Sequence, residues 1–269
     1  MMKNKIMIPS IITIFLLIVI GVAFLVKFQF DKNQHLISVN LNGKWEFIDK
    51  SGKMVIQPVY DGAGSFKEGL AKVTLNDKMG FIDKSGKMII QPVYDRADSF
   101  QEGLALVSVN DKWGYIDKTG KMVIQPVYDG ANSFQEGLAN VSLNDKVGFI
   151  DKTSKMIIQP IYDNALSFEE GLALVSVNDK QGYIDKTGKM IIQPVYDAAG
   201  SFKEGLALVS LNGKVGFIDK TGKMIIQPVY DFALSFKEGL APVRLTYKWG
   251  FIDKTGKMII QPIYDFVDI

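Results

Sequence analysis

The 269-residue chain contains no cysteine and only one histidine, His35. Without cysteine it can form no disulfide, no thiol nucleophile and no cysteine-ligated zinc site. A single imidazole also excludes any chemistry that requires two. The formal net charge is only +2, which argues against a strongly basic nucleic-acid-binding protein. We therefore expect no cofactor, no metal centre and no nucleic-acid partner.

One long apolar run occurs near the N-terminus. Residues 1–5 contain two lysines, and residues 6–26 contain no charged side chain. Rising by about 1.5 Å per residue, a helix over 6–26 would match a hydrocarbon core of about 30 Å. We predict a transmembrane anchor at 6–26 after a short tail at 1–5. A cleaved secretory signal is the alternative, because Gly21-Val22-Ala23 resembles a small-residue cleavage site.

The lysine balance across residues 6–26 predicts on which side of the membrane the rest of the chain lies. Two lysines and the terminal amine precede the run, whereas Lys27 and Lys32 follow it and are offset by Asp31. Excess positive charge favours the cytoplasmic side. We expect a single-pass cell-membrane protein with an extracytoplasmic body, or a secreted protein if the run is a cleaved signal.

After a linker at 27–35, the sequence repeats every 34 residues without insertion or deletion. Seven prolines keep the period, at positions 58, 92, 126, 160, 194, 228 and 262. The units are 36–69, 70–103, 104–137, 138–171, 172–205, 206–239 and 240–269. A unit of this size cannot bury its own apolar face, so we expect stability to come from stacking of neighbouring units.

The unit at 104–137 is predicted to form a three-stranded meander. Residues 104–109, 113–117 and 122–125 have the composition of strands. Asn110-Asp111 predicts a tight hairpin turn between the first two strands. Pro126 is expected to end the third strand, because proline cannot donate to a β-ladder.

Other side chains of this unit have predicted structural roles. Asp117 is placed to bond the backbone of the turn at 118–121, where Gly120 is free to take a positive φ. Tyr128 and Phe134 recur in the other units and are expected to pack between neighbours.

The two faces of the first strand differ in what they tolerate. Ala105 and Val107 share a face that stays Ala and Val in every full copy. Position 106 lies on the opposite face and holds Lys72, Asn140 or Pro242 in other units. We expect that second face to be exposed, at least in those three units.

No helical pattern appears outside 6–26, so the body is predicted to be all-β. Seven meanders could close into a propeller-like ring or stack as an open β-solenoid. Thirty-four residues is short for a four-stranded blade, but no polar cap marks either end, as an open stack would require. We expect the closed ring, with the open solenoid as the alternative.

The tetrad Lys-Trp-Gly-Tyr at 112–115 returns in altered form in every unit, followed by Ile-Asp-Lys and later by Pro-x-Tyr-Asp. Over residues 36–265 this pattern resembles the bacterial WG repeat, also called the KWG repeat. The chain departs from it where Glu46 replaces a glycine and where tryptophan is lost from four units. The resemblance implies a β-repeat protein, often associated with the cell envelope, and supplies no catalytic residue.

Carboxylates recur in the units, represented by Asp117, Asp129 and Glu136. Paired acids about 5–10 Å apart can cleave glycosides. Because these acids are repeated beside turns, however, capping is the simpler interpretation. His35 has no second metal-ligating side chain near it in sequence and is interpreted as a solvated linker residue.

Positions that differ between units are the candidates for binding. Three units keep the tryptophan: Trp45, Trp113 and Trp249. Flat aromatic faces suit sugar rings or peptide side chains, although packing between units would explain them as well. The least repeat-like residues are Phe232, Leu234, Arg244 and Tyr247. Because varied loops on a rigid framework commonly form binding surfaces, we expect a partner at that end.

These observations predict a non-enzymatic, membrane-anchored binding or scaffold protein of a bacterial envelope. Its expected partner is an envelope protein, a peptide or a cell-wall glycan. One alternative is an envelope glycan hydrolase that uses the acids of one divergent unit. A second alternative is a purely structural spacer, for which exchanging loops between units would have no effect on function.

Overall fold

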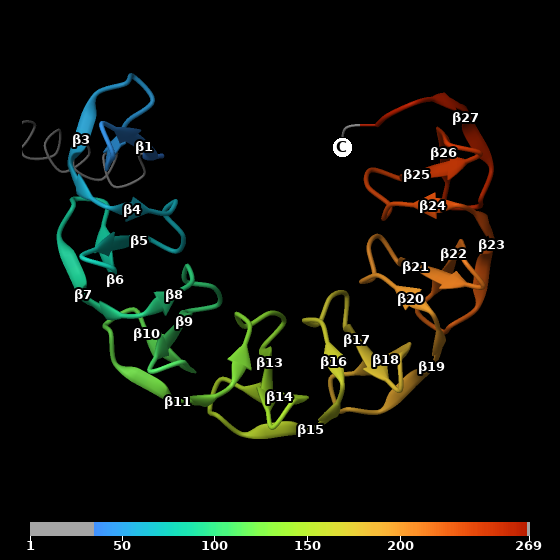
Figure 1. Ribbon diagram of the computed structural model, residues 1–269, viewed down its shortest axis with the longest axis horizontal. Helices are drawn as coiled ribbons and strands as arrows, with labels where there is room; N and C mark the ends of the chain where they lie inside the picture. The colour runs from blue at the N-terminus through green and yellow to red at the C-terminus, as the bar shows by residue number, and fades with distance from the viewer. Residues whose placement is uncertain (1–34, 268–269) are drawn as a thin grey trace, which may run out of the picture.

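The computed structural model describes residues 35–267, in which seven small β-sheets follow one another around an open arc (Figure 1). The membrane segment predicted at 6–26 lies outside this range. No helix within residues 35–267 is long and apolar enough to cross a membrane. The prediction of an all-β repeat body is confirmed. We call each sheet a blade, numbered 1 to 7 along the chain.

Each blade contains three long antiparallel strands, and blades 2 to 7 add a two-residue strand at one edge. Blade 1 consists of β1 (Ile37–Leu41), β2 (Lys44–Ile48) and β3 (Met54–Tyr60). Blade 2 consists of β4 (Gly62–Ala63), β5 (Leu70–Leu75), β6 (Lys78–Asp83) and β7 (Met88–Tyr94). Blade 3 consists of β8 (Arg96–Ala97), β9 (Leu104–Val109), β10 (Lys112–Asp117) and β11 (Met122–Tyr128). Blade 4 consists of β12 (Gly130–Ala131), β13 (Leu138–Leu143), β14 (Lys146–Asp151) and β15 (Met156–Tyr162).

The remaining three blades repeat the same order. Blade 5 consists of β16 (Asn164–Ala165), β17 (Leu172–Val177), β18 (Lys180–Asp185) and β19 (Met190–Tyr196). Blade 6 consists of β20 (Ala198–Ala199), β21 (Leu206–Leu211), β22 (Lys214–Asp219) and β23 (Met224–Tyr230). Blade 7 consists of β24 (Phe232–Ala233), β25 (Leu240–Leu245), β26 (Lys248–Asp253) and β27 (Met258–Tyr264).

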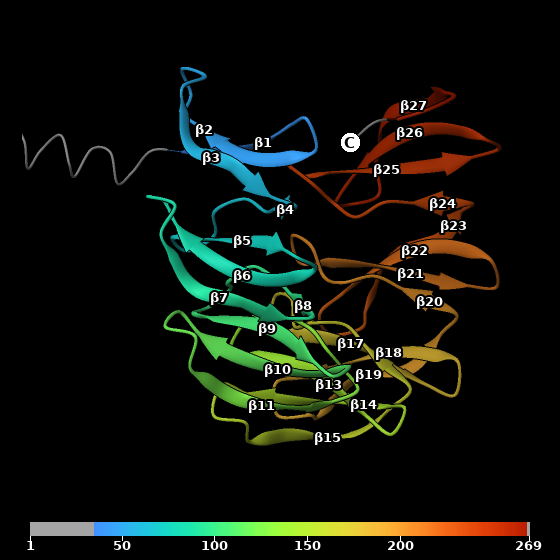
Figure 2. The ribbon, with the colours of Figure 1, turned by 60° about the vertical axis from the view of Figure 1, so that its left-hand side comes forward.

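The arc does not close. Blades 1 and 7 stand on either side of an opening in Figure 1, and Figure 2 shows the blades stacked one upon the next. Within the described range, no strand of the last unit joins the sheet of blade 1. The closed ring that we expected is therefore wrong, and the chain forms the open alternative. Closure depends on small rotations between units, which the strand pattern within one unit does not encode.

The two hairpin elements of each unit form as predicted. In blade 3, β9 and β10 pair without interruption, and Asn110 and Asp111 turn between them with φ of 49° and 59°. Two consecutive positive φ angles are typical of the type I′ turn that suits twisted hairpins. The Asp117 carboxylate then accepts the N–H of Thr119 at 2.9 Å, and Gly120 adopts a φ of 87°.

The third long strand is longer than predicted. β11 continues through Pro126 to Tyr128, and it gains two extra residues against β10 because Tyr115 pairs with Ile124 while Trp113 pairs with Tyr128. A proline is tolerated inside such a bulge, where the ladder is already interrupted. The bulge presses against β10 so closely that a Cβ on Gly114 would lie 2.5 Å from a backbone oxygen of β11.

The short strand is an element that the sequence pattern did not predict. In blade 3, Arg96 and Ala97 of β8 pair with Ser108 and Val107 of β9. β8 belongs to the loop of the preceding unit, so each blade from 2 to 7 is completed by its predecessor. Two residues are too few to show the alternation by which longer strands are recognised.

The apolar core lies between blades. Leu70, Phe81, Ile90 and Tyr94 of blade 2, with Phe100 of the following loop, pack against one face of blade 3. That face presents Ala105, Val107 and Ile116. The predicted packing of Tyr and Phe between units is thus confirmed for Tyr94 and Phe100.

The opposite face of the first strand is buried too, contrary to our expectation. Leu106 and Asn140 are buried and Lys72 is half-buried, and the polar side chains at this position donate to the next blade, although Oδ1 of Asn140 has no hydrogen-bond partner among the described residues. Asn140 donates from Nδ2 to the carbonyl of Ala165 at 2.8 Å, and Lys72 donates from Nζ to the carbonyl of Ala97 at 2.7 Å. A polar residue there indicates a hydrogen bond across the blade boundary rather than a solvated face.

A second series of contacts ties three units together. The third long strands form the outer rim of the arc, and the loops that follow the short strands point toward its inside (Figure 1). In one such loop, the Glu102 carboxylate accepts the N–H of Gly137 at 3.0 Å and pairs with Lys152 at 3.1 Å. The same arrangement recurs at Glu68, Glu136, Glu170 and Glu204.

Candidate functional site

A row of three side chains crosses each of blades 2 to 7 near the hairpin turn between the first two long strands. The middle residue of the row is the fifth residue of the first long strand. It pairs on one side with the first residue of the short strand and on the other side with the second residue of the second long strand. We call it the variable row. In chain order the rows are Gly62–Thr74–Met79, Arg96–Ser108–Trp113, Gly130–Ser142–Val147, Asn164–Ser176–Gln181, Ala198–Ser210–Val215 and Phe232–Arg244–Trp249.

The variable row of blade 7 is the bulkiest of the six. The rings of Phe232 and Trp249 meet edge to face with 5.8 Å between their centroids. The Arg244 guanidinium lies 5.5 Å from the Phe232 ring centroid and 5.7 Å from that of Trp249. A cation at this range from aromatic rings is attracted by their quadrupoles. Phe232 is also largely exposed.

Within the described residues, the charge of Arg244 acts on Asp231 and, after the Lys214 contact, helps to lower the pKa of that carboxyl. Arg244 makes no ion pair there, and its Nε is buried without a hydrogen-bond partner. A buried donor without a partner is unfavourable. The last blade therefore combines an exposed aromatic side chain with a cation that makes no direct ion pair among the described residues.

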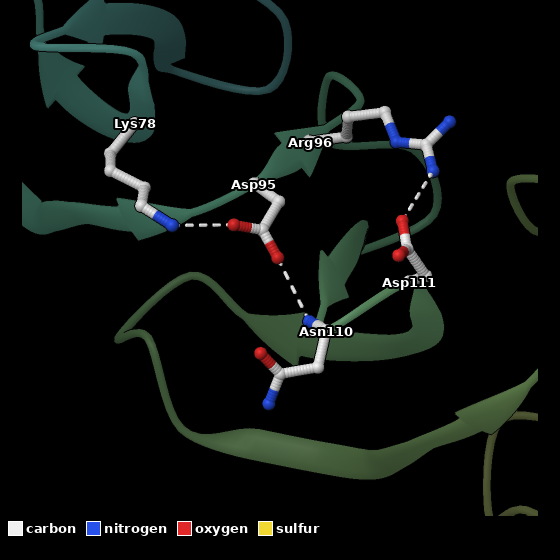
Figure 3. A network of polar contacts seen from close by, with 5 residues as sticks. All are labelled: Lys78, Asp95, Arg96, Asn110 and Asp111. Carbon is white, nitrogen blue, oxygen red and sulfur yellow. Dashed lines mark hydrogen bonds and ion pairs between the residues drawn. The ribbon is translucent and has the colours of Figure 1, made fainter.

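The variable row of blade 3 has the same components in a different order. Arg96 lies over Trp113, with 4.9 Å from the guanidinium carbon to the ring centroid. Unlike Arg244, Arg96 makes a direct ion pair within the described residues, because Asp111 of the hairpin turn lies 3.5 Å away (Figure 3). We did not single out Arg96 from the sequence, although alignment of the units places it at the position of Phe232 and would have revealed it.

A structural network borders the row. Figure 3 shows Asp95 between two blades: one carboxylate oxygen accepts from Lys78 at 2.5 Å and the other accepts the N–H of Asn110 at 2.8 Å. The Lys78 interaction and then the Asn110 hydrogen bond hold the pKa of Asp95 below its usual range. The acids of this series are therefore engaged in joining blades.

The other predicted site residues lie apart from this cluster or at its margin. Tyr247 occupies the hairpin turn of blade 7 and is 84% exposed, and Leu234 follows the short strand and is partly exposed. Trp45 is half-buried in blade 1 and Trp113 in blade 3. The structure thus brings Phe232, Arg244 and Trp249 together, whereas the three tryptophans do not form one site.

Asp117 and Asp129, two of the recurrent carboxylates, lack the electrostatics of a general acid. A hydrogen bond from the Thr119 hydroxyl lowers the pKa of Asp117, and the Lys112 contact lowers that of Asp129. A general acid would instead need a raised pKa. Among residues 35–267, no three His, Cys, Asp or Glu side chains gather in a way that could hold a metal ion.

Comparison with known proteins identifies the repeats. The family described as "WG containing repeat" matches seven times, at residues 47–78, 79–113, 113–146, 148–180, 182–214, 216–249 and 249–268. No curated protein matches the sequence.

Solved structures resemble this chain at low sequence identity. A crystal structure of the eukaryotic initiation factor is 12% identical with a TM-score of 0.57, covering 86% of this chain and 74% of that one. Kluyveromyces lactis Hsv2 is 8% identical with a TM-score of 0.46, covering 83% of this chain and 88% of that one. The first is a likeness of fold alone, and the second, below 0.5, supports nothing further. The seven family matches span nearly the whole described body, so the chain belongs to the family of proteins with WG containing repeats.

Proposed function

We propose that this repeat protein is a non-enzymatic binding scaffold that recognises a protein or peptide through blade 7. The observation that carries the proposal is the Phe232–Arg244–Trp249 row, with Tyr247 exposed beside it. Aromatic residues and arginine are the side chains most enriched among the energetically dominant residues of protein interfaces. The other blades keep the same framework without this combination.

The chemistry of the row indicates what the partner presents. Arg244 makes no direct ion pair among the described residues, and a carboxylate from a partner would supply one. Phe232 offers apolar surface next to it. The partner segment should therefore contain an acidic residue next to an apolar residue.

A cell-wall glycan is the less favoured ligand. Sugar rings stack on open aromatic faces, but Arg96 lies over Trp113, and Trp249 contacts both Arg244 and Phe232. Those two tryptophans already have partners. Trp45 remains the one tryptophan for which the structure gives no such partner.

The location of the protein is part of the proposal. The uncharged run at 6–26 and the lysines before it support a single membrane span with the repeats on the extracytoplasmic side. Protease added to intact cells should then digest the repeat body under conditions that cut a known surface protein. Protection of the body in that experiment would contradict the orientation.

The binding site can be tested with residues from the chain itself. Blade 6 carries Ala198, Ser210 and Val215 at the variable row, so the triple variant Phe232→Ala/Arg244→Ser/Trp249→Val gives blade 7 the row of blade 6. Full-length protein and this variant would be immobilised and incubated with detergent-solubilised envelope proteins and, separately, with washed cell-wall sacculi. We expect the wild type to retain a discrete protein and the variant to lose it by about 30-fold, as for an interface hot spot.

A matched control changes the corresponding row of blade 3, in the variant Arg96→Ala/Trp113→Val. This control should retain the partner as the wild type does. Equal retention by all three proteins would overturn the assignment to blade 7. Retention of sacculi alone would replace the protein partner with a glycan, and turnover of an envelope glycan would overturn the non-enzymatic function.

A further inference from the structure

The two ends of the arc expose the two halves of the interface that joins neighbouring blades. Inside the arc, the residue pair Tyr230 and Phe217 of blade 6 is covered by blade 7. On blade 7 the equivalent residues Tyr264 and Phe251 have no further blade over them, and Tyr264 is 48% exposed whereas Tyr230 is 5% exposed. The next residues of the chain, Asp265 and Phe266, are exposed as well.

The complementary half lies on blade 1. There, among residues 35–267, no two-residue strand borders β1, whereas one borders the first long strand in every other blade. The residue at the interface position occupied by Ala71 in blade 2 is Ile37, and it is exposed. β1 therefore presents a free edge and an apolar face together.

Shifting the internal pairing by one unit predicts how the two halves would meet. Phe232 and Ala233 pair with Arg244 and Val243 inside the chain. One unit further on, Phe266 and Val267 would pair with Asn40 and Val39 of a second copy. Strand addition of this kind is a general mode of recognition at a free sheet edge.

Hydrogen bonding at the two ends matches in the same register. Asp231 accepts from Lys214 and from the N–H of Thr246 in the following blade. Asp265 pairs with Lys248 but has no following blade, and its side chain is 88% exposed compared with 35% for Asp231. In the shifted register, the missing N–H is that of Asn42 in a second copy.

The charges at the two ends are complementary as well. Glu204 accepts the N–H of Gly239 at 3.0 Å and pairs with Lys254 at 2.9 Å. One unit further on, Glu238 makes no ion pair within the described residues, and neither does Lys50 of blade 1. The shifted register brings Glu238 next to Lys50 of a second copy.

The sequence that precedes β1 in the same chain does not carry the residues that fill this edge elsewhere. In all seven units, aspartate stands where Asp61 does, but the corresponding residue before β1 is Lys27. Glycine follows each internal loop at the position of Gly69, where His35 stands before β1. Residues 264–267, in contrast, retain the Tyr-Asp motif and an apolar residue at the Ala position.

We propose that copies of this chain associate head to tail, with the end of blade 7 of one copy docked on the edge and face of blade 1 of the next. The contact is heterologous, because each copy contributes a different surface. Both end surfaces border the same opening (Figure 1), so the docked copy steps out of the plane of the first arc and the assembly grows as a superhelix. The Phe232–Arg244–Trp249 row lies on this same end face of blade 7, because its blade 6 equivalent Val215 packs against the following blade. Head-to-tail docking and partner binding at the row therefore compete for one face.

The absence of cysteine allows a direct test by cross-linking. Full-length Val39→Cys and full-length Val267→Cys, carrying different tags, would be mixed and oxidised. Residues paired in an antiparallel ladder have Cα atoms about 4.5–5.5 Å apart, within the range that a disulfide spans. We expect a mixed dimer from the two variants together and a ladder of higher multimers from the double variant Val39→Cys/Val267→Cys.

The matched control replaces Val267→Cys with Lys257→Cys, which puts the thiol on an exposed turn of the same blade. This pair, and each single variant alone, should give only background cross-linking. If the Val39→Cys and Val267→Cys pair gives no more product than the control pair, the proposal is overturned.

A charge exchange tests the register independently of oxidation yield. In the presence of the two cysteines, Glu238→Lys should lower the cross-linked fraction several-fold, because it faces Lys50 of the next copy. Adding Lys50→Glu should restore that fraction. A loss that Lys50→Glu does not restore would contradict the proposed register.

Discussion

Blades 6 and 7 have the same strand order and register but differ in their exposed chemistry. Blade 6 carries the small row Ala198–Ser210–Val215, and blade 7 carries Phe232–Arg244–Trp249 in the same backbone positions. The bulge and the turns are alike in both. The comparison shows that the framework is specified by one set of residues and the surface by another.

The same two blades differ in burial even where their residues are identical. Tyr230 and Tyr264 follow the same Ile-Ile-Gln-Pro segment, yet the first is buried and the second is half exposed. Burial in this molecule is therefore a property of the neighbouring blade and cannot be assigned to a residue from its own unit.

The largest effect is expected from removing the large buried ring of each blade. Phe217 is fully buried and lies 5.0 Å from the Phe236 ring centroid, whereas Phe251 is only partly buried. Phe217→Ala should destabilise the protein by about 3–5 kcal/mol, as for a core aromatic, and Phe251→Ala by less than half of that. Chemical denaturation of the two purified variants would measure the difference, and equal losses would contradict the dependence on the neighbouring blade.

A smaller effect with the opposite sign is expected in blade 1. Glu46 stands at the glycine position, where it is buried and its Oε2 has no hydrogen-bond partner among the described residues. Glu46→Gly should stabilise the protein by about 1–3 kcal/mol, because it removes an unsatisfied buried group. Gly80→Ala is the matched control and should destabilise, since its Cβ would lie 2.5 Å from the Ile90 carbonyl oxygen. If the Glu46→Gly variant were less stable than the wild type, the unsatisfied Glu46 carboxyl would not be destabilising, and this prediction would be wrong.

The smallest effect concerns the dependence of stability on pH. The Lys214 contact and then the N–H of Thr246 hold the pKa of Asp231 below its usual range. A carboxyl with a lowered folded-state pKa contributes stability above its unfolded pKa of about 3.9, and this contribution is lost as the pH falls through the folded value. Asp231→Asn should therefore lower stability at pH 7 and make the acid-induced loss less steep.

Asp265→Asn provides the comparison from blade 7. Asp265 has the lysine contact but no following blade to bond, so this variant should change stability less than Asp231→Asn does. Thermal unfolding between pH 3 and pH 7 would measure both. If the two variants behaved alike, the bond to the following blade would contribute nothing.

Sequence patterns predicted those parts of the fold that depend on short-range chemistry. Asn110-Asp111 and Gly120 predicted the turns in which they lie, because few residues adopt positive φ easily. The recurrence of Tyr94 and Phe100 equivalents indicated packing between units. These features are local or repeat at one fixed spacing, so a single sequence contains them.

The features that were missed depend on neighbours. The two-residue strand Arg96–Ala97 exists only because the next blade offers an edge, and Lys72 is satisfied only by a carbonyl of the following loop. Closure of the ring depends on the angle at which neighbouring blades pack, which the pattern within one unit does not encode. At the site, Phe232 and Arg244 were found as departures from the repeat, but their contact with Trp249 required the register.

The blade-joining aspartates and the open arc together make the molecule an elastic element. Each joint between blades repeats nearly the same contacts, and among residues 35–267 no strand of blade 7 pairs with blade 1 across the opening. A small change in angle at each joint adds up along the arc, so the distance between the ends changes much more than any single joint does. Stretching the protein should therefore first change the angles between blades and widen the opening. Blades should unfold only afterwards, starting from the two ends, where each blade has one neighbour instead of two.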